Sequence, residues 1–136
     1  MLHLVDRPAA LAETRRILGP DGRVAIATFH ESHFAAHWLT RYLPSLERVD
    51  LARFPTEAQL VAELGEAGFA GVETHRLAQR TTVSRREALI RMRERHISTF
   101  DLIDENEIER GLAEAERTLP EIVEFELRWL VAVGSA

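Results

Sequence analysis

The segment from Arg23 to Phe29 constrains the fold of this chain more than any other part of its sequence. It reads Arg-Val-Ala-Ile-Ala-Thr-Phe, so neither of the two alternating faces of a strand would be polar. A strand without a polar face is covered on both sides, as in a parallel sheet with helices packed on each face. The turn Gly19-Pro20-Asp21-Gly22 precedes it and ends a helix that Asp6 caps. A helix followed by a buried strand predicts an α/β fold.

The remainder of the chain alternates helices with two further strands. Thr56 and Gln59 have the spacing of a capping box, which starts a helix, and Gly68 suits the left-handed position that ends one. Residues 32–43 are a candidate helix, and the residues that follow Pro44 are expected to be irregular. The predicted elements after the first strand are a helical insert at 30–54, a helix from 56, a strand at 72–83, helices from 84 and 104, and an alternating strand at 123–131.

The composition excludes several functional classes. The chain has 136 residues, which suits a single domain, and its lack of cysteine excludes disulfides, thiol catalysis and cysteine-ligated zinc. Its net charge of −5 argues against general nucleic-acid binding. No apolar run approaches the ~20 residues of a membrane-spanning helix, and the N-terminus lacks the pattern of a signal peptide. We therefore expect a cytoplasmic protein that binds neither nucleic acid nor a membrane.

Two stretches resemble class I, Rossmann-like, S-adenosylmethionine-dependent methyltransferases. Residues 12–26, Ala-Glu-Thr-Arg-Arg-Ile-Leu-Gly-Pro-Asp-Gly-Arg-Val-Ala-Ile, are similar to the helix, turn and fifth strand of that family, although Asp21 replaces a glycine that is common in the turn. Residues 60–72, which contain Glu-Ala-Gly-Phe at 66–69, are similar to the next helix and the entry to the sixth strand. The resemblance implies a partial α/β fold, with a small three-stranded mixed sheet in the family order 5-7-6 and flanking helices.

The resemblance also implies that the cofactor-binding half is missing. The family holds S-adenosylmethionine on a glycine-rich turn after its first strand, because bare backbone must approach the ligand closely. Gly65, Gly68 and Gly71 are spaced by three, but they lie at the end of a predicted helix. We expect residues 1–136 to be a single, truncated, methyltransferase-like domain. Its variable, substrate-side segments would lie at 30–54 and 84–118.

Histidines and aromatic residues supply the candidate site. His30, His33 and His37 follow the first strand, and α/β sites gather at the carboxyl ends of strands. His33 and His37 have the i, i+4 spacing of a metal pair, but no carboxylate is obviously placed as a further ligand, so no metal site is predicted. An aromatic stripe of Phe34, Trp38 and Tyr42 is interpreted as core or lid packing, or as part of a substrate cage. The predicted substrate-binding residues are His30, His33, Trp38, Tyr42 and His96, and the predicted cofactor-binding residue is His3.

The function that this resemblance implies is methyl transfer from S-adenosylmethionine to a small molecule. The isolated chain is expected to be inactive and to bind the cofactor very weakly, so whether it is an enzyme by itself stays open. The alternative is a non-catalytic remnant, or a partner-binding module that dimerises through an exposed sheet edge. In either case we expect the bare edge of the first strand to be covered by a second copy of the chain or by a missing N-terminal half. The methyl acceptor and its acceptor atom are not predicted.

Overall fold

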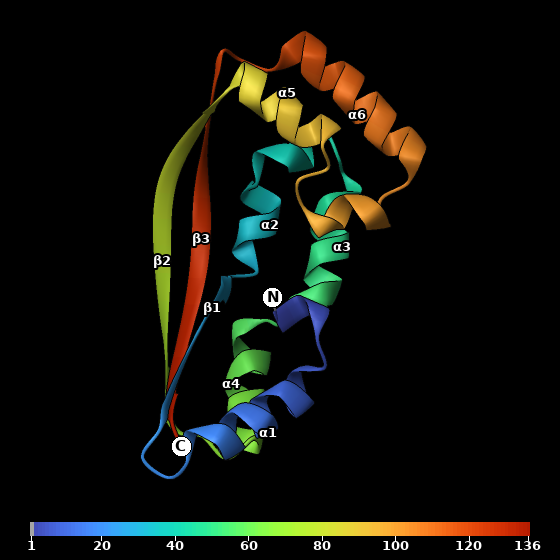
Figure 1. The fold of residues 1–136 in the computed structure, drawn as a ribbon. Coiled ribbons are helices and arrows are strands. Elements are labelled where there is room, and N and C mark those ends of the chain that lie inside the picture. The colour runs from blue at the N-terminus through green and yellow to red at the C-terminus, as the bar shows by residue number, and fades with distance from the viewer. Residues whose placement is uncertain (1) are drawn as a thin grey trace. The chain divides into compact units, whose positions relative to one another are not determined.

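The computed structural model describes residues 2–136 and confirms the predicted order of helices and strands (Figure 1). The first strand begins and ends where the sequence predicts, at Arg23 and Phe29. In chain order, the elements are η1 (Leu2–Leu4), α1 (Arg7–Leu18), β1 (Arg23–Phe29), α2 (Ser32–Ala36), η2 (Trp38–Arg41), α3 (Ser45–Arg53), α4 (Glu57–Glu66), β2 (Ala70–Ser84), α5 (Arg85–Arg93), η3 (Ser98–Leu102), α6 (Glu105–Thr118) and β3 (Ile122–Ser135).

The three strands form one sheet in the order β1-β3-β2, so the last strand lies in the middle, as expected. β1 and β3 run antiparallel, from Arg23 opposite Ser135 to Phe29 opposite Trp129. The expectation that β1 is covered on both faces is wrong for this part of the chain, because Ala25 and Ala27 are exposed. Among residues 2–136, β1 has β3 as its only neighbouring strand, and no helix covers the alanine face.

The chain divides into two compact units. The first consists of the chain up to Glu31, Arg53–Ala78 and Arg128–Ala136, and the second consists of Ser32–Ala52 and Gln79–Leu127. The second unit contains most of the insert predicted at 30–54 and all of the segment predicted at 84–118. That the chain is a single domain with variable substrate-side segments stays a prediction.

The first unit is built around α1, α4 and the C-terminal part of β3. Its core is formed by Leu11, Leu60, Leu64, Phe69, Leu130 and Ala132. The side chain of Arg7 on α1 donates to both carboxylate oxygens of Glu63 on α4, at 2.8 and 2.7 Å. Gly68 has a φ of +89° after α4, and the following N–H of Phe69 donates to the carbonyl of Leu64 at 3.0 Å. This is the left-handed helix end that the sequence predicts.

The second unit is built around α3, α5 and α6, with a core that includes Leu43, Leu46, Met92 and Phe100. Gly111 of α6 lies against the chain end of η2, because a Cβ at this position would stand 2.4 Å from the carbonyl oxygen of Tyr42. The residues after Pro44 were expected to be irregular, and this expectation is wrong, because they form α3.

The predicted helix at 32–43 is also corrected by the structure. α2 ends at Ala36, and His37 has a ψ of 135°, which is extended backbone. The chain then continues as the short 3₁₀ helix η2. Because the helix is interrupted at His37, the i, i+4 spacings of His33 with His37 and of Phe34 with Trp38 do not lie on one continuous helix. The reason for the break is local: the imidazole of His37 caps η2.

The last strand, β3, is longer than predicted and changes its buried face along its length. Val123 is buried, as the predicted alternation requires, but further along the buried residues are Leu130 and Ala132. Trp129 and Val131, which were expected on the apolar face, are only partly buried.

In the part of the chain from residue 2 onward, no helix is long and apolar enough to span a membrane.

Candidate functional site

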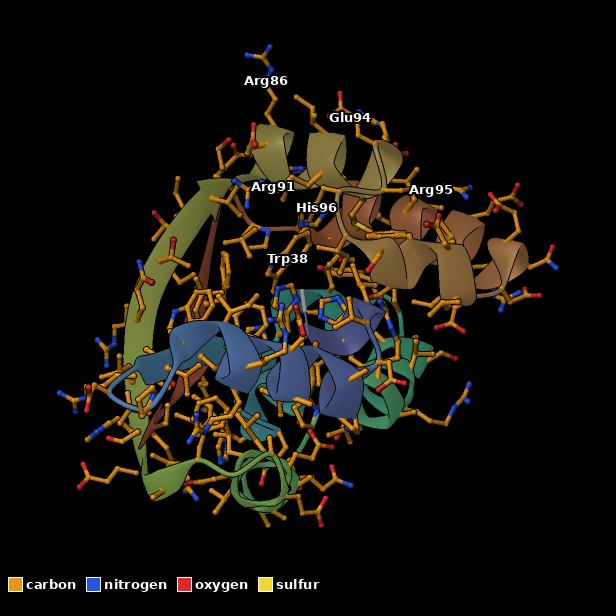
Figure 2. The ribbon with its side chains drawn as sticks, turned by 60° about the horizontal axis from the view of Figure 1, so that its bottom comes forward. Trp38, Arg86, Arg91, Glu94, Arg95 and His96 are labelled. Carbon is orange, nitrogen blue, oxygen red and sulfur yellow. The ribbon has the colours of Figure 1, made fainter. Side chains whose placement is uncertain are left out.

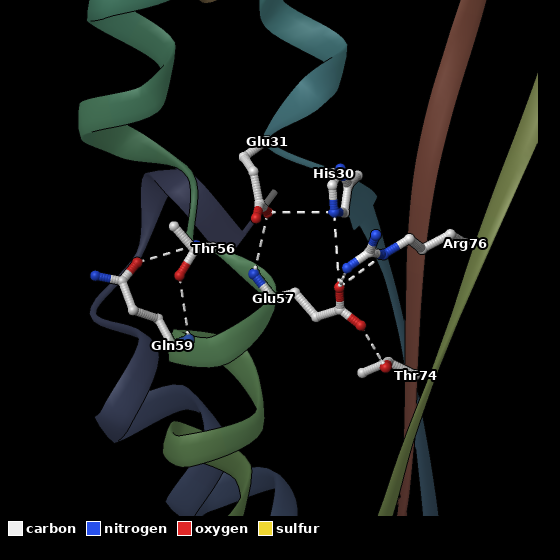
Figure 3. Close-up of polar contacts among 7 residues, drawn as sticks. All are labelled: His30, Glu31, Thr56, Glu57, Gln59, Thr74 and Arg76. Carbon is white, nitrogen blue, oxygen red and sulfur yellow. Dashed lines mark hydrogen bonds and ion pairs between the residues drawn. The ribbon is translucent and has the colours of Figure 1, made fainter.

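His30 immediately follows β1 and is held by the sheet. Its backbone N–H donates to the carbonyl of Arg128 at 2.9 Å, which extends the pairing of β1 with β3 by one residue. The residue is 8% exposed, and its Nε2 lies 3.6 Å from a carboxylate oxygen of Glu31 and 3.6 Å from one of Glu57 (Figure 3). These distances are too long for hydrogen bonds, so the two carboxylates lie beside the ring without accepting from it.

Glu57, the first residue of α4, organises this cluster. Its side chain accepts a hydrogen bond of 2.5 Å from the Thr74 hydroxyl and pairs with the Arg76 guanidinium, both from β2 (Figure 3). Its own backbone N–H donates to the Glu31 carboxylate at 3.2 Å. The hydrogen bond from Thr74, followed by that from Arg76, lowers the pKa of the Glu57 carboxyl. The cluster therefore places two carboxylates and one guanidinium around the His30 ring.

A capping box fixes the position of Glu57. The Thr56 hydroxyl accepts from the backbone N–H of Gln59 at 3.2 Å, and the Gln59 side chain accepts from the backbone N–H of Thr56 at 2.9 Å. Both hydrogen bonds were predicted from the sequence, and they set where α4 begins. Glu57 therefore stands in the first turn, where the helix dipole stabilises a carboxylate.

His3, the predicted cofactor residue, lies in the same unit as His30. Its ring stacks on Phe54, with centroids 4.1 Å apart, and Phe54 in turn lies 6.3 Å from Phe29. Phe29 stacks across the strands on Trp129 at 4.4 Å. Burial lowers the pKa of His3. These aromatic rings form a connected row beside the carboxyl end of β1, and whether His3 contacts a cofactor stays a prediction.

A separate groove lies in the second unit. It has a volume of about 470 Å³ and is lined by Trp38 and Tyr42, two of the predicted substrate residues, together with His37, Arg41, Leu119 and Val123. The ring of Trp38 lies 6.4 Å from Tyr42 and 6.5 Å from Phe125. A volume of this size falls in the range of small-molecule sites.

The imidazole of His37 is neutral and has a fixed tautomer. Its Nδ1 accepts a hydrogen bond from the backbone N–H of Leu39 at 3.2 Å, so a neutral ring carries its proton on Nε2. Burial, with smaller effects of His33 and His96, lowers the pKa of His37 to about 3. The ring contacts His33 at 5.2 Å and Phe125 at 5.6 Å, both edge to face.

The other predicted substrate residues do not line this groove. His33 is buried behind it, with its ring against Phe34 and His37. His96 follows α5, is exposed, and has its Nδ1 3.0 Å from the carbonyl of Arg91. The predicted stripe is also interrupted, since the break at His37 separates Phe34 from the Trp38–Tyr42 pair. Within residues 2–136, no group of three metal-ligating side chains is placed to hold an ion.

The arginines of α5 mostly neutralise carboxylates. Arg91 pairs with Glu87 at 3.1 Å and Arg93 with Glu116 at 2.6 Å. Arg86 projects away from the helix into solvent (Figure 2). Exposed pairs of this kind contribute little to stability. This face therefore has the character of a solvated surface, and the absence of nucleic-acid binding stays a prediction.

The described residues do not supply the backbone cradle that an adenosyl cofactor requires in this fold. The glycines with positive φ are Gly19, Gly68 and Gly71, of which the first two end helices and the third lies in β2. β1 is followed by His30 and Glu31, and not by a glycine turn that opens a helix. That these residues by themselves bind S-adenosylmethionine very weakly stays a prediction.

Sequence reasoning missed Glu31, Glu57, Thr74 and Arg76. Each was visible as a polar residue, but no local pattern relates the four, because they come from the end of β1, the start of α4 and the middle of β2. His37 was noticed only for its spacing from His33. Its role as a neutral cap depends on the break in the helix, which the sequence did not predict.

No protein-family model matches the sequence, and no curated protein is similar to it. Solved structures do match. A protein from Anabaena variabilis, described as a candidate methyltransferase from an antibiotic biosynthesis pathway, superposes with a TM-score of 0.65 at 19% identity, over 97% of this chain and 62% of that one. A candidate methyltransferase from Bacillus halodurans gives 0.48 at 14%, over 94% and 57%. A phosphoethanolamine N-methyltransferase from Haemonchus contortus, in complex with phosphomonomethylethanolamine and S-adenosylhomocysteine, gives 0.46 at 13%, over 98% and 31%.

The match to the Anabaena protein shows that this chain has part of a Rossmann-like methyltransferase fold. The chain spans less than two thirds of the length of that protein, while nearly all of the chain is matched. More than a third of the matched fold therefore has no counterpart among these residues.

Proposed function

We propose that these residues form the acceptor side of an S-adenosylmethionine-dependent methyltransferase that acts on a small molecule. The observation that carries the proposal is the fold match, which includes nearly the whole chain but only 62% of the Anabaena protein. In this proposal the residues that hold the cofactor lie outside the segment, and the chain without them is inactive. Among the described residues, no strand is followed by a glycine turn that opens a helix, which supports this division.

His30 is the residue of the first unit that is best placed to handle a proton. Methyl transfer requires mainly positioning, together with a base where the acceptor atom carries a proton. A histidine whose ring is oriented by a carboxylate is a common base. Here a carboxylate oxygen of Glu31 and one of Glu57 each lie 3.6 Å from Nε2, and in this role the ring takes up the proton of the acceptor. The two carboxylates then stabilise the imidazolium.

Calorimetry and activity measurements test the proposal together. The isolated chain, titrated with S-adenosylhomocysteine, is expected to show no micromolar binding. Co-expression with the polypeptide encoded directly upstream is expected to restore micromolar binding and methyl transfer. Micromolar binding by the isolated chain would contradict the proposed place of the cofactor residues. A completed protein that binds no S-adenosylhomocysteine would contradict the methyltransferase itself.

Substitution of His30 tests whether its ring acts in the reaction and not in cofactor binding. In the completed protein, His30→Asn is expected to lower kcat by about 10²-fold or more, the range of general-base catalysis, while the affinity for S-adenosylhomocysteine is unchanged. A matched control is His75→Asn, which changes an exposed histidine of β2. Equal loss in both variants would show that His30 has no role in the reaction.

A second candidate function is partner binding through the free edge of β1. Among the described residues this strand pairs only with β3, and Ala25 and Ala27 leave one of its faces exposed. An open, apolar strand edge recruits another strand. In this alternative a second copy of the chain covers the edge, so light scattering is expected to show a dimer. Ala27→Glu is expected to dissociate this dimer, whereas Ala58→Glu, at an exposed position of α4, is expected to leave it intact. A monomer at all concentrations would contradict it.

A further inference from the structure

The groove of the second unit has two charged residues without ion-pair partners. Arg41 is exposed and holds its guanidinium 5.7 Å from the centre of the Tyr42 ring, but within residues 2–136 it pairs with no carboxylate. Glu124, an exposed residue of β3, also lines the groove and pairs with no cation in the same part of the chain. Arg91 and Arg93 of α5, in contrast, are engaged with glutamates.

Aromatic and aliphatic side chains line the groove together. Trp38 and Tyr42 contribute rings from η2 and its end, and the buried Leu119 and Val123 contribute aliphatic side chains. The hydroxyl of Tyr42 lies 3.3 Å from that of Thr118, which fixes the ring, and Gly111 allows α6 to approach the Tyr42 backbone. Flat aromatic walls favour a flat aromatic ligand, because stacked rings gain more than the area they bury.

His37 adds a hydrogen-bond donor that does not depend on pH in the neutral range. Its Nδ1 is occupied by the N–H of Leu39, so Nε2 holds the proton and donates. Nε2 has no acceptor among residues 2–136. A ring that is neutral at neutral pH offers a hydrogen bond but no charge, which leaves Arg41 as the only cation that lines the groove in the described chain.

We propose that this groove binds a planar aromatic acid that carries a hydroxyl or amino group. Arg41 pairs with the carboxylate, Trp38 stacks on the ring, and Glu124 accepts a hydrogen bond from the hydroxyl or amine. The inference goes beyond the proposed function and does not use the cluster around His30. The binding itself requires only the residues of the second unit.

The experiment is an NMR titration of the 136-residue chain with 4-hydroxybenzoate. The chain has two tryptophans, and Trp129→Phe identifies the indole N–H signal of Trp38. We expect the Trp38 signal to shift with a dissociation constant below 1 mM, while the Trp129 signal does not move. Three related compounds separate the contributions: phenol lacks the carboxylate, benzoate lacks the hydroxyl, and trans-4-hydroxycyclohexanecarboxylate lacks the aromatic ring.

Each of these three compounds is expected to bind at least 10-fold more weakly than 4-hydroxybenzoate, since a charge-assisted hydrogen bond is worth about 1.5–3 kcal/mol. Arg41→Gln is expected to weaken 4-hydroxybenzoate about 10-fold and to leave phenol unchanged. The matched control is Arg48→Gln, an exposed arginine of α3, which is expected to change neither. Both variants are compared by their amide spectra, so a folding defect is recognised directly.

Several outcomes would overturn the inference: no shift of Trp38 up to 10 mM ligand, phenol that binds as tightly as 4-hydroxybenzoate, or an equal effect of Arg41→Gln and Arg48→Gln. Failure of the proposed function gives a different pattern. If the groove binds the aromatic acid while the completed protein binds no S-adenosylhomocysteine, the ligand assignment stands and the methyl-transfer proposal falls.

Discussion

The carboxylate of Glu107 on α6 accepts two hydrogen bonds from Ser45, one from its backbone N–H at 2.8 Å and one from its hydroxyl at 2.7 Å. Ser45 is the first residue of α3. The side chain of Glu107 therefore satisfies an N–H in the first turn of another helix and places a negative charge at the positive end of its dipole. These two hydrogen bonds connect α6 to the start of α3, which follows the η2 residues that line the groove of the second unit.

Removal of this contact is expected to destabilise the second unit. Glu107→Ala leaves the Ser45 N–H without its acceptor, and loss of a helix cap costs about 1 kcal/mol. We expect the free energy of unfolding in urea to fall by about 1–2 kcal/mol. The control is Glu109→Ala, an exposed residue of the same helix, which is expected to change stability by less than about 0.5 kcal/mol. Equal losses in the two variants would show that the contact does not stabilise α3.

The contrast between α3 and α4 shows what the sequence can predict. α4 carries its cap within four residues, Thr56 to Gln59, so both its start and its capping box were predicted. α3 is capped by Glu107, which lies 62 residues away in the sequence, so no local sequence pattern predicts this cap. The same distinction holds for the first site, where the sequence identified His30 but not Glu57, which approaches it only in the folded chain.

His37 is expected to make stability depend on pH. Its pKa is lowered from 6.5 to about 3 in the folded chain, so the unfolded state binds the proton first as the pH falls. The stabilisation is complete above about pH 6.5 and decreases toward pH 3. Each unit of pKa difference corresponds to about 1.4 kcal/mol, so a loss of a few kcal/mol is expected across this window.

His37→Asn isolates this effect. Asparagine is a good N-cap, so its side chain can accept the Leu39 N–H while it lacks a titratable group. We expect the variant to match the wild type at pH 7.5 within about 1 kcal/mol and to become relatively more stable as the pH falls to 4.5. The ring signals of His37, followed by NMR, should not titrate between pH 5 and 8. A midpoint near 6.5 would refute the assigned tautomer and charge.

Arg95 is expected to be a site where glycine stabilises the chain. It has a φ of +50° at the end of α5, and the following N–H of His96 donates to the carbonyl of Arg91 at 3.2 Å. This left-handed position is normally occupied by glycine, because a Cβ is strained there. Arg95→Gly should raise the free energy of unfolding by about 0.5–1 kcal/mol. Glu105→Gln, which removes only the exposed ion pair with Arg95, should change it little; a loss of stability in Arg95→Gly would contradict the strain argument.

Glu57 connects the stability of the first unit to the charge around His30. The Thr74 and Arg76 hydrogen bonds lower the pKa of its carboxyl, so the carboxylate stabilises the folded chain above about pH 4.5, and this contribution is lost as the pH falls through the lower folded pKa. Glu57→Gln should therefore cost about 1 kcal/mol at pH 7 and show a shallower decline between pH 5 and 3 than the wild type. Glu73→Gln, an exposed carboxyl of β2, should keep the wild-type slope. If the Glu57→Gln and wild-type curves stay parallel, the carboxylate does not interact with Thr74 and Arg76 in solution.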